Sequence, residues 1–127
     1  MAWEKKYLDM MNQWLILKQE GKSIGNYLDK RGNHTVAVYG MALYGRHIIR
    51  ELQGTDIVVA YGMDRKKMNA YKGIEVLQPI GELPYVDVII NSVIHDHINV
   101  KNTLANITNI PVLCLEDVVF DSYDCGN

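Results

Sequence analysis

The sequence has few of the residues on which disulfide-linked, metal-binding and many catalytic domains depend. It contains two cysteines, three prolines and one phenylalanine. Cys114 lies in an apolar run and Cys125 near the end; two cysteines are too few for a disulfide framework and lack metal-ligand spacing, so we expect free thiols. The patterns H-E-x-x-H, C-x-x-C and G-x-S-x-G are absent, and no tyrosine stands four residues before a lysine. The sequence therefore predicts no catalytic residue and no metal site.

An excess of one charge and a long apolar run are lacking as well. Thirteen basic and fifteen acidic residues are interspersed and give a net charge of −2, so no basic surface predicts nucleic-acid binding. No stretch approaches the roughly 20 apolar residues of a membrane-spanning helix. The start, MAWEKKYLDM, carries charges where a secretory signal needs an apolar run. These absences predict a cytoplasmic protein without membrane insertion.

Residues 1–33 predict a helical extension before the main domain. Apolar residues recur there in alternating steps of four and three, which places them on one side of a helix ending at Gly21: Trp3, Tyr7, Met10, Trp14 and Leu17. A shorter helix is predicted from Ser23, a preferred N-cap residue, to about Lys30, with Gly32 as its stop.

The aromatic side of the first helix has two interpretations. Amphipathic helices usually cover the core of their own domain. Aromatic side chains also dominate the energetics of protein interfaces, and two tryptophans and a tyrosine on one short helix predict a homodimer through this segment. Both interpretations remain open at this point.

From residue 34 to 127, short apolar runs alternate with helical segments. Five runs predict strands: TVAVYG (35–40), DIVVAYG (56–62), GIEVL (73–77), VDVIINSVI (86–94) and PVLCL (111–115). Helices are predicted over about 43–52 and 98–107, while Pro79 and Pro84 interrupt the segments between the second and fourth strands. With right-handed crossovers, this order predicts an α/β fold: one Rossmann-like, doubly wound parallel sheet of about five strands in the order 3-2-1-4-5.

The stretch VYGMALYGRH (38–47) resembles the dinucleotide-binding pattern G-x-G-x-x-G with its middle glycine replaced. Gly40 permits the tight turn after a strand, and Gly45 permits close packing of the following helix. The Ala42 methyl narrows the approach of a pyrophosphate to the helix N-terminus but removes no N–H donor. We therefore expect weakened binding of NAD, NADP or a nucleotide-sugar by the loop Gly40, Met41, Ala42, Leu43, Tyr44 and Gly45.

An acidic residue follows the second strand, as in dinucleotide-binding domains. Asp64 lies a little beyond the usual spacing of about twenty residues and is placed to accept hydrogen bonds from a ribose. The alternative is that Asp64 is the N-cap of a following helix. Arg65, Lys66 and Lys67 come next and also suit a 2′-phosphate, so the sequence does not separate NAD from NADP.

A polar segment, SVIHDHIN, follows the fourth strand, where ligands bind in open α/β sheets. Ser92 and His95 are predicted to contact the ligand, and Asp96 is predicted to cap the next helix with its side chain. His95 and His97 have no evident third metal ligand, so we expect no metal here.

Three stretches together carry a family resemblance: TVAVYGMALYGRHIIREL, DIVVAYGMDRKK and YKGIEVLQPIGELPYVDVIINSV. Residues 34–119 resemble Rossmann-like modules of bacterial surface-polysaccharide systems, which are attached to glycosyltransferases or to nucleotide-sugar-modifying enzymes. The resemblance implies a nucleotide-binding module with a glycosyltransferase or nucleotide-sugar enzyme as partner. It leaves two hypotheses: a ligand-binding module without catalysis of its own, or an interaction module whose N-terminal helices mediate dimerisation or docking.

Overall fold

Five parallel strands form one sheet in the computed structural model of the chain, which describes residues 2–124. The order across the sheet is β3-β2-β1-β4-β5, and every neighbouring pair is parallel. The strands are β1 (Thr35–Tyr39), β2 (Val58–Met63), β3 (Val76–Leu77), β4 (Val88–Asn91) and β5 (Val112–Cys114). The predicted α/β fold and strand order are confirmed, although β3 keeps only the last two residues of its predicted run.

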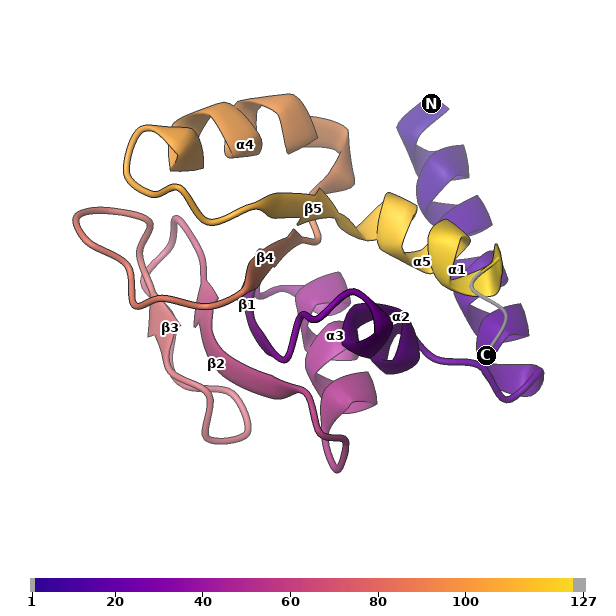
Figure 1. The fold of residues 1–127 in the computed structure, drawn as a ribbon. Coiled ribbons are helices and arrows are strands. Elements are labelled where there is room, and N and C mark those ends of the chain that lie inside the picture. The colour runs from indigo at the N-terminus through magenta and orange to yellow at the C-terminus, as the bar shows by residue number, and fades with distance from the viewer. Residues whose placement is uncertain (1, 125–127) are drawn as a thin grey trace.

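Helices precede, connect and follow these strands (Figure 1). They are α1 (Ala2–Gln19), α2 (Ile24–Lys30), α3 (Leu43–Leu52), the 3-10 turn η1 (Ile94–Asp96), α4 (His97–Ala105) and α5 (Leu115–Asp124). Ser23 caps α2 as predicted, because its Oγ accepts a hydrogen bond from the Asn26 N–H at 3.1 Å. The two N-terminal helices are thus confirmed, as are α3 and α4.

Helix α5 is absent from the sequence prediction. The fifth strand ends at Cys114, and Leu115 begins a helix instead of completing the strand. The residues that α5 buries have the spacing of a helix side: Leu115, Val118, Val119 and Ser122. This spacing could have predicted the helix from the sequence. The helix follows an apolar strand directly, however, and no Gly or Pro marks the boundary between the two.

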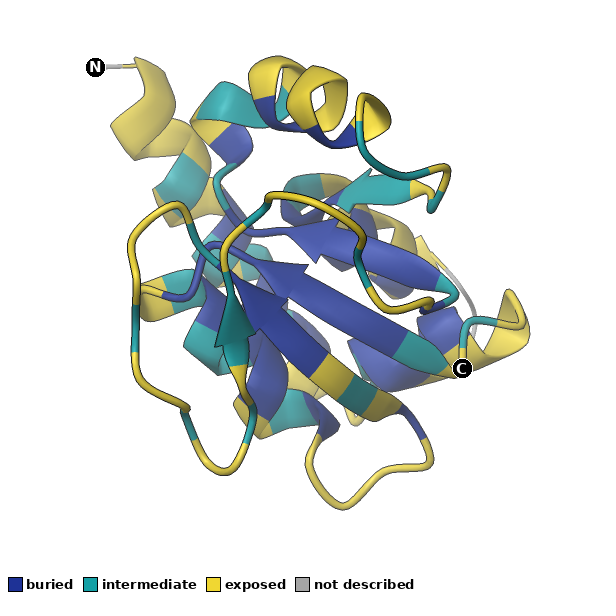
Figure 2. Ribbon diagram, turned by 90° about the vertical axis from the view of Figure 1, so that its left-hand side faces the viewer, coloured by how far each residue is buried: buried dark blue, intermediate teal, exposed yellow. Residues whose placement is uncertain are grey.

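The two faces of the sheet are covered unequally. Val36 and Val38 of β1 pack in a cluster with buried residues of α1, α2, α3 and α5. Ala37 and Tyr39, which point to the opposite face, pack with Val100 and Leu104 of α4. Figure 2 shows most of the strand residues buried, whereas the first half of β2 and the loops around the sheet are largely exposed or partly exposed. No helix is found in 64–75, nor in 78–87, which Pro79 and Pro84 interrupt, so loops complete the α4 side.

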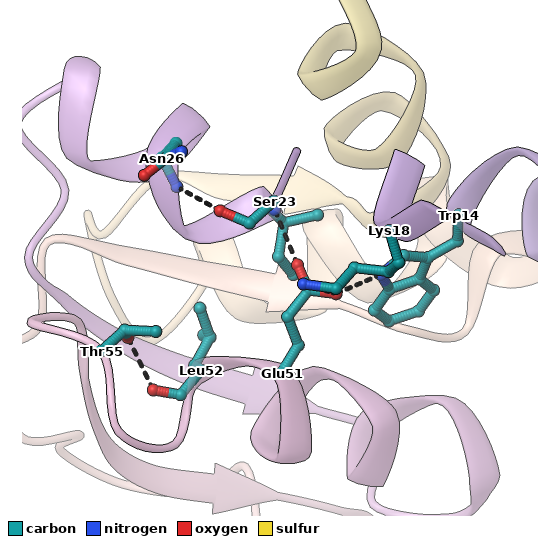
Figure 3. Close-up of polar contacts among 8 residues, drawn as sticks. Trp14, Lys18, Ser23, Asn26, Glu51, Leu52 and Thr55 are labelled. Carbon is teal, nitrogen blue, oxygen red and sulfur yellow. Dashed lines mark hydrogen bonds and ion pairs between the residues drawn. The ribbon is translucent and has the colours of Figure 1, made fainter. Parts of the chain in front are cut away.

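Glu51 of α3 connects both N-terminal helices to the domain (Figure 3). Its Oε1 accepts a hydrogen bond from the Trp14 indole N–H at 2.6 Å, and its Oε2 accepts one from the Ile24 N–H at 2.7 Å. The Lys18 ammonium lies 3.8 Å from Oε1, and the Glu51 side chain is only 6% exposed. One buried carboxylate therefore satisfies an indole on α1 and the first N–H of α2.

Replacing Glu51 by alanine leaves two donors without their acceptor. An unsatisfied buried donor costs about 1–3 kcal/mol, so we expect Glu51→Ala to lower the free energy of unfolding by roughly 2–6 kcal/mol. Urea unfolding followed by circular dichroism measures this. Glu20→Ala, which removes an exposed carboxylate at the end of α1, should change stability by less than about 0.5 kcal/mol. Equal effects of the two substitutions would contradict the role given to Glu51.

Candidate functional site

The glycine loop is packed against its own helix and against β4. Gly40 has a φ of +87°, and a side chain there would also collide with Ser92 and Val93. A Cβ on Gly45 would collide with the Gly40 carbonyl oxygen, so α3 approaches the end of β1 as closely as its backbone allows. Both glycines therefore have the structural roles that the sequence predicts for them.

The loop presents the N-terminus of α3 at the carboxyl edge of the sheet. Ala42 occupies the N-cap position and is exposed, and no side chain caps the helix there. The first N–H groups of a helix have no acceptor within the helix and carry its positive dipole end. Leu43 is also exposed and Tyr44 is partly exposed. This edge offers backbone donors to an anion.

Asp64 is bound directly to the glycine loop. Its Oδ2 accepts a hydrogen bond from the Met41 N–H at 2.9 Å, and its Oδ1 accepts one from the Lys66 N–H at 2.9 Å. No helix follows within residues 65–75, so the alternative that Asp64 is the N-cap of a next helix is wrong. A carboxylate oxygen has two lone pairs, so each oxygen can still accept one further hydrogen bond.

A cavity of about 430 Å³ lies beside Asp64, between the ends of β1 and β3 and helix α4. Its lining mixes polar and apolar side chains: Tyr39, Arg65, Gln78, Pro79, Ile80, Asp96, Asn99, Val100 and Thr103. Burial raises the pKa of Tyr39, the Arg65 charge opposes this effect, and the carboxylates of Asp64 and Asp96 add to it. The Tyr39 phenol is therefore protonated at neutral pH and able to donate a hydrogen bond.

Ser92, the residue that follows β4, connects this strand to the glycine loop through hydrogen bonds. Its Oγ lies 2.9 Å from the Tyr39 carbonyl oxygen and 2.7 Å from that of Gly40, and its side chain is buried. The single hydroxyl proton is thus shared between two carbonyl acceptors of the loop. In this arrangement Ser92 fixes the turn at Gly40.

His95 faces helix α1 rather than the glycine loop. Its Nδ1 lies 2.8 Å from the Tyr7 hydroxyl, and its ring meets Trp3 edge-on at 6.3 Å between centroids. Tyr7 also stacks on Tyr44 of α3 at 4.8 Å between centroids. Helix α1 therefore covers one end of the carboxyl edge. The contacts of Tyr7 with Tyr44 and His95 could not be predicted from the sequence, because no regular spacing relates these three positions.

A second cavity, of about 520 Å³, is lined in part by His95 and Trp3. The rest of its lining comes from η1, the first turn of α4, the end of β5 and the start of α5. Burial lowers the pKa of His97, and Asp117 acts in the opposite direction. Within residues 2–124, no three His, Cys, Asp or Glu side chains are arranged to hold a metal ion.

The structure describes one of the two cysteines. Cys114 at the end of β5 is a free, buried thiol, as the sequence predicts, and burial raises its pKa. Cys125 lies outside the described residues. The raised pKa keeps the Cys114 thiol protonated at neutral pH, which makes it a poor nucleophile.

The predicted capping role of Asp96 is wrong. Asp96 does occupy the N-cap position of α4, but its side chain makes no hydrogen bond to the helix backbone. Its Oδ1 instead accepts a hydrogen bond from the Asn99 side-chain amide at 2.8 Å. The 3-10 turn immediately before α4 gives Asp96 a ψ of 22°, outside the extended conformation that is typical of a capping residue.

Comparisons with protein-family models, curated proteins and solved structures found no match to this chain. In the described part of the chain, no helix combines the length and apolar character needed to cross a membrane. Function is therefore inferred from the fold, which is compatible with nucleotide binding, and from the geometry of this edge.

The two helical glycines Gly45 and Gly25 make a matched test of loop packing. Gly45→Ala should lower the free energy of unfolding by about 1–3 kcal/mol or more, because the added methyl collides with the Gly40 carbonyl. Gly25→Ala in α2 should range from neutral to about 1 kcal/mol stabilising, since its methyl meets Leu52 at an ordinary 3.5 Å. Denaturant unfolding compares the two, and a neutral Gly45→Ala would refute the close packing.

Proposed function

We propose that this chain is a small nucleotide-binding module. Its ligand is a nucleotide with a ribose and a diphosphate, either NAD(P) or a nucleotide-sugar. The observation that carries the proposal is the Asp64 carboxylate, held by the Met41 and Lys66 N–H groups at the end of β2. This position matches that of the ribose-binding acid in dinucleotide-binding sheets, and two backbone donors fix its orientation before a ligand arrives.

The diphosphate is assigned to the N-terminus of α3. Ala42, Leu43 and Tyr44 are exposed or partly exposed there, and no capping side chain competes for the N–H groups. Anions bind at such helix ends because the donors and the dipole act together. Gly40 and Gly45 shape the turn that positions these N–H groups.

The nucleoside is assigned to the cavity of about 430 Å³ next to Asp64. This volume lies within the range of roughly 300–1,000 Å³ that small-molecule sites occupy. Arg65 and the Tyr39 phenol supply donors to it. Ser92 supports the turn under the phosphates, and His95 borders the opposite end of the edge, where the second half of a dinucleotide or the sugar would extend.

The module is proposed to have no catalysis of its own. The described residues of the edge offer donors and acceptors for binding. The resemblance of residues 34–119 to modules of surface-polysaccharide systems supports a glycosyltransferase or nucleotide-sugar enzyme as the partner that supplies the chemistry. The proposed compartment is the cytoplasm.

A second candidate is an interaction module whose glycine loop is structural. The specific observation in its favour is that Leu8 and Leu15 are exposed on α1, away from the domain core. The loop also satisfies several of its own polar groups through Asp64 and Ser92. Ligand titration separates the two candidates.

Calorimetric titration with NAD, NADP, ADP and UDP-glucose tests the nucleotide proposal. Ala42→Gly should strengthen binding about five- to thirty-fold. Removing the methyl relieves its steric hindrance of the phosphate, which is worth about one or two kcal/mol of binding free energy. Asp64→Asn should weaken it about tenfold or more, through loss of the charged acceptor for the ribose.

Asp56→Asn is the matched control. Asp56 is exposed just before the start of β2, at the end of the strand opposite Asp64, so its substitution should leave the affinity unchanged. Thermal unfolding of the free variants checks that each remains folded. Absence of binding at millimolar concentration in both the unmodified protein and Ala42→Gly would leave the interaction module as the better proposal. Tight binding that Ala42→Gly weakens would mean that the methyl belongs to the site.

A further inference from the structure

Helix α1 carries a second stripe of side chains beside the one that packs on the domain. Its residues recur in steps of four and three, so they lie along one side of the helix: Glu4, Leu8, Met11, Leu15 and Lys18. The side that packs on the domain contains the buried Met10, Trp14 and Leu17, and each of these residues directly precedes a residue of the second stripe. Leu8 is nevertheless 69% exposed and Leu15 56% exposed. The fold therefore leaves an apolar stripe of α1 uncovered.

A groove of about 340 Å³ runs along this stripe between α1 and α3. Met11, Trp14 and Leu15 form its α1 side, and His47 and Arg50 contribute from α3. Projecting leucines and an apolar groove thus share one surface. A twofold dimer needs such self-complementarity, because each copy must supply both the projecting side chain and the groove that receives it.

The charges at the two ends of the stripe indicate which molecule covers it. Met11 stands midway between the acidic Glu4 and the basic Lys18, seven residues from each. If two α1 helices pair antiparallel about Met11, Glu4 of each copy lies opposite Lys18 of the other, and Leu8 lies next to Leu15. A parallel pair would place like charges opposite each other. The stripe is therefore complementary to itself in one orientation.

We propose that the second stripe of α1 is a homodimer interface formed by antiparallel pairing of α1 with α1 of a second copy. This inference goes beyond nucleotide binding and does not depend on it. It keeps the N-terminal helix as the dimer segment but uses a different side from that predicted by the aromatic residues, because Trp14 and Met10 are buried in their own domain. Lys18 contributes although it lies near Glu51, since its side chain is 48% exposed and its ammonium has three donors.

Sedimentation equilibrium of the full chain measures the dimer and its Kd. Leu8→Glu and Leu15→Glu should each weaken dimerisation by roughly a hundredfold or more, because a carboxylate would enter the apolar centre of the interface. Ile98→Glu is the control: Ile98 is 75% exposed on α4, on the opposite side of the sheet, and its replacement should leave Kd unchanged. Circular dichroism confirms that each variant is folded.

Exchange of the end charges tests the orientation without disturbing the apolar centre. Glu4→Lys and Lys18→Glu should each weaken dimerisation roughly tenfold, because each converts two attractive pairs into repulsive ones. An equimolar mixture of the two variants should recover the original Kd through a mixed dimer in which every pair is again attractive. In Lys18→Glu the introduced carboxylate is also repelled by Glu51 of the same copy. That repulsion persists in the mixture, so recovery reports contacts between copies.

Three results would overturn the proposal. The first is an unmodified chain that stays monomeric up to millimolar concentration. The second is a dimer whose Kd responds to neither the leucine nor the charge variants. The third is a monomer that sediments with phosphatidylcholine–phosphatidylglycerol vesicles and loses that binding in Leu8→Glu, which would make a lipid surface the occupant of the stripe.

Discussion

The close approach of α3 to the end of β1 is the constraint on which the carboxyl edge of this sheet depends. Gly45 has no room for a side chain against the Gly40 carbonyl, and Gly40 turns the chain with a positive φ. The contact aims the first N–H groups of α3 at the edge. It also brings the Met41 N–H within reach of Asp64, which follows β2, while Ser92, which follows β4, donates to the carbonyl groups of Tyr39 and Gly40. The loop is thus fixed from both neighbouring strands.

Fixation of the loop has consequences for binding. Asp64, Ser92 and His95 each have a partner inside the protein, so a ligand must use the remaining lone pairs and the exposed N–H groups of the helix end. Groups that are already oriented lose little entropy when a ligand binds. The same internal hydrogen bonds also stabilise the edge without a ligand, which is why a structural loop and a binding loop have similar geometry here.

Glu51 has a comparable role for the N-terminal helices. Burial of a carboxylate is costly unless hydrogen bonds and charge compensate it, and Trp14, Ile24 and Lys18 together provide that compensation. The inner side of α1 therefore packs on the domain. Its second apolar stripe, one residue further along, then faces outward beside α3. The exposed leucines of α1 follow from how the buried side is held.

The sequence by itself determined the parallel sheet, its strand order and the position of the glycine loop, because these depend on local periodicity and on the conformations that glycine and proline allow. It failed at α5, where an apolar strand passes into a helix without a break. Only the tertiary structure decided that Asp64 binds the Met41 N–H, that His95 meets Tyr7, and which side of α1 is buried. These contacts join residues far apart in the chain, and they arise when crossovers and helix packing bring separate elements to one edge of the sheet.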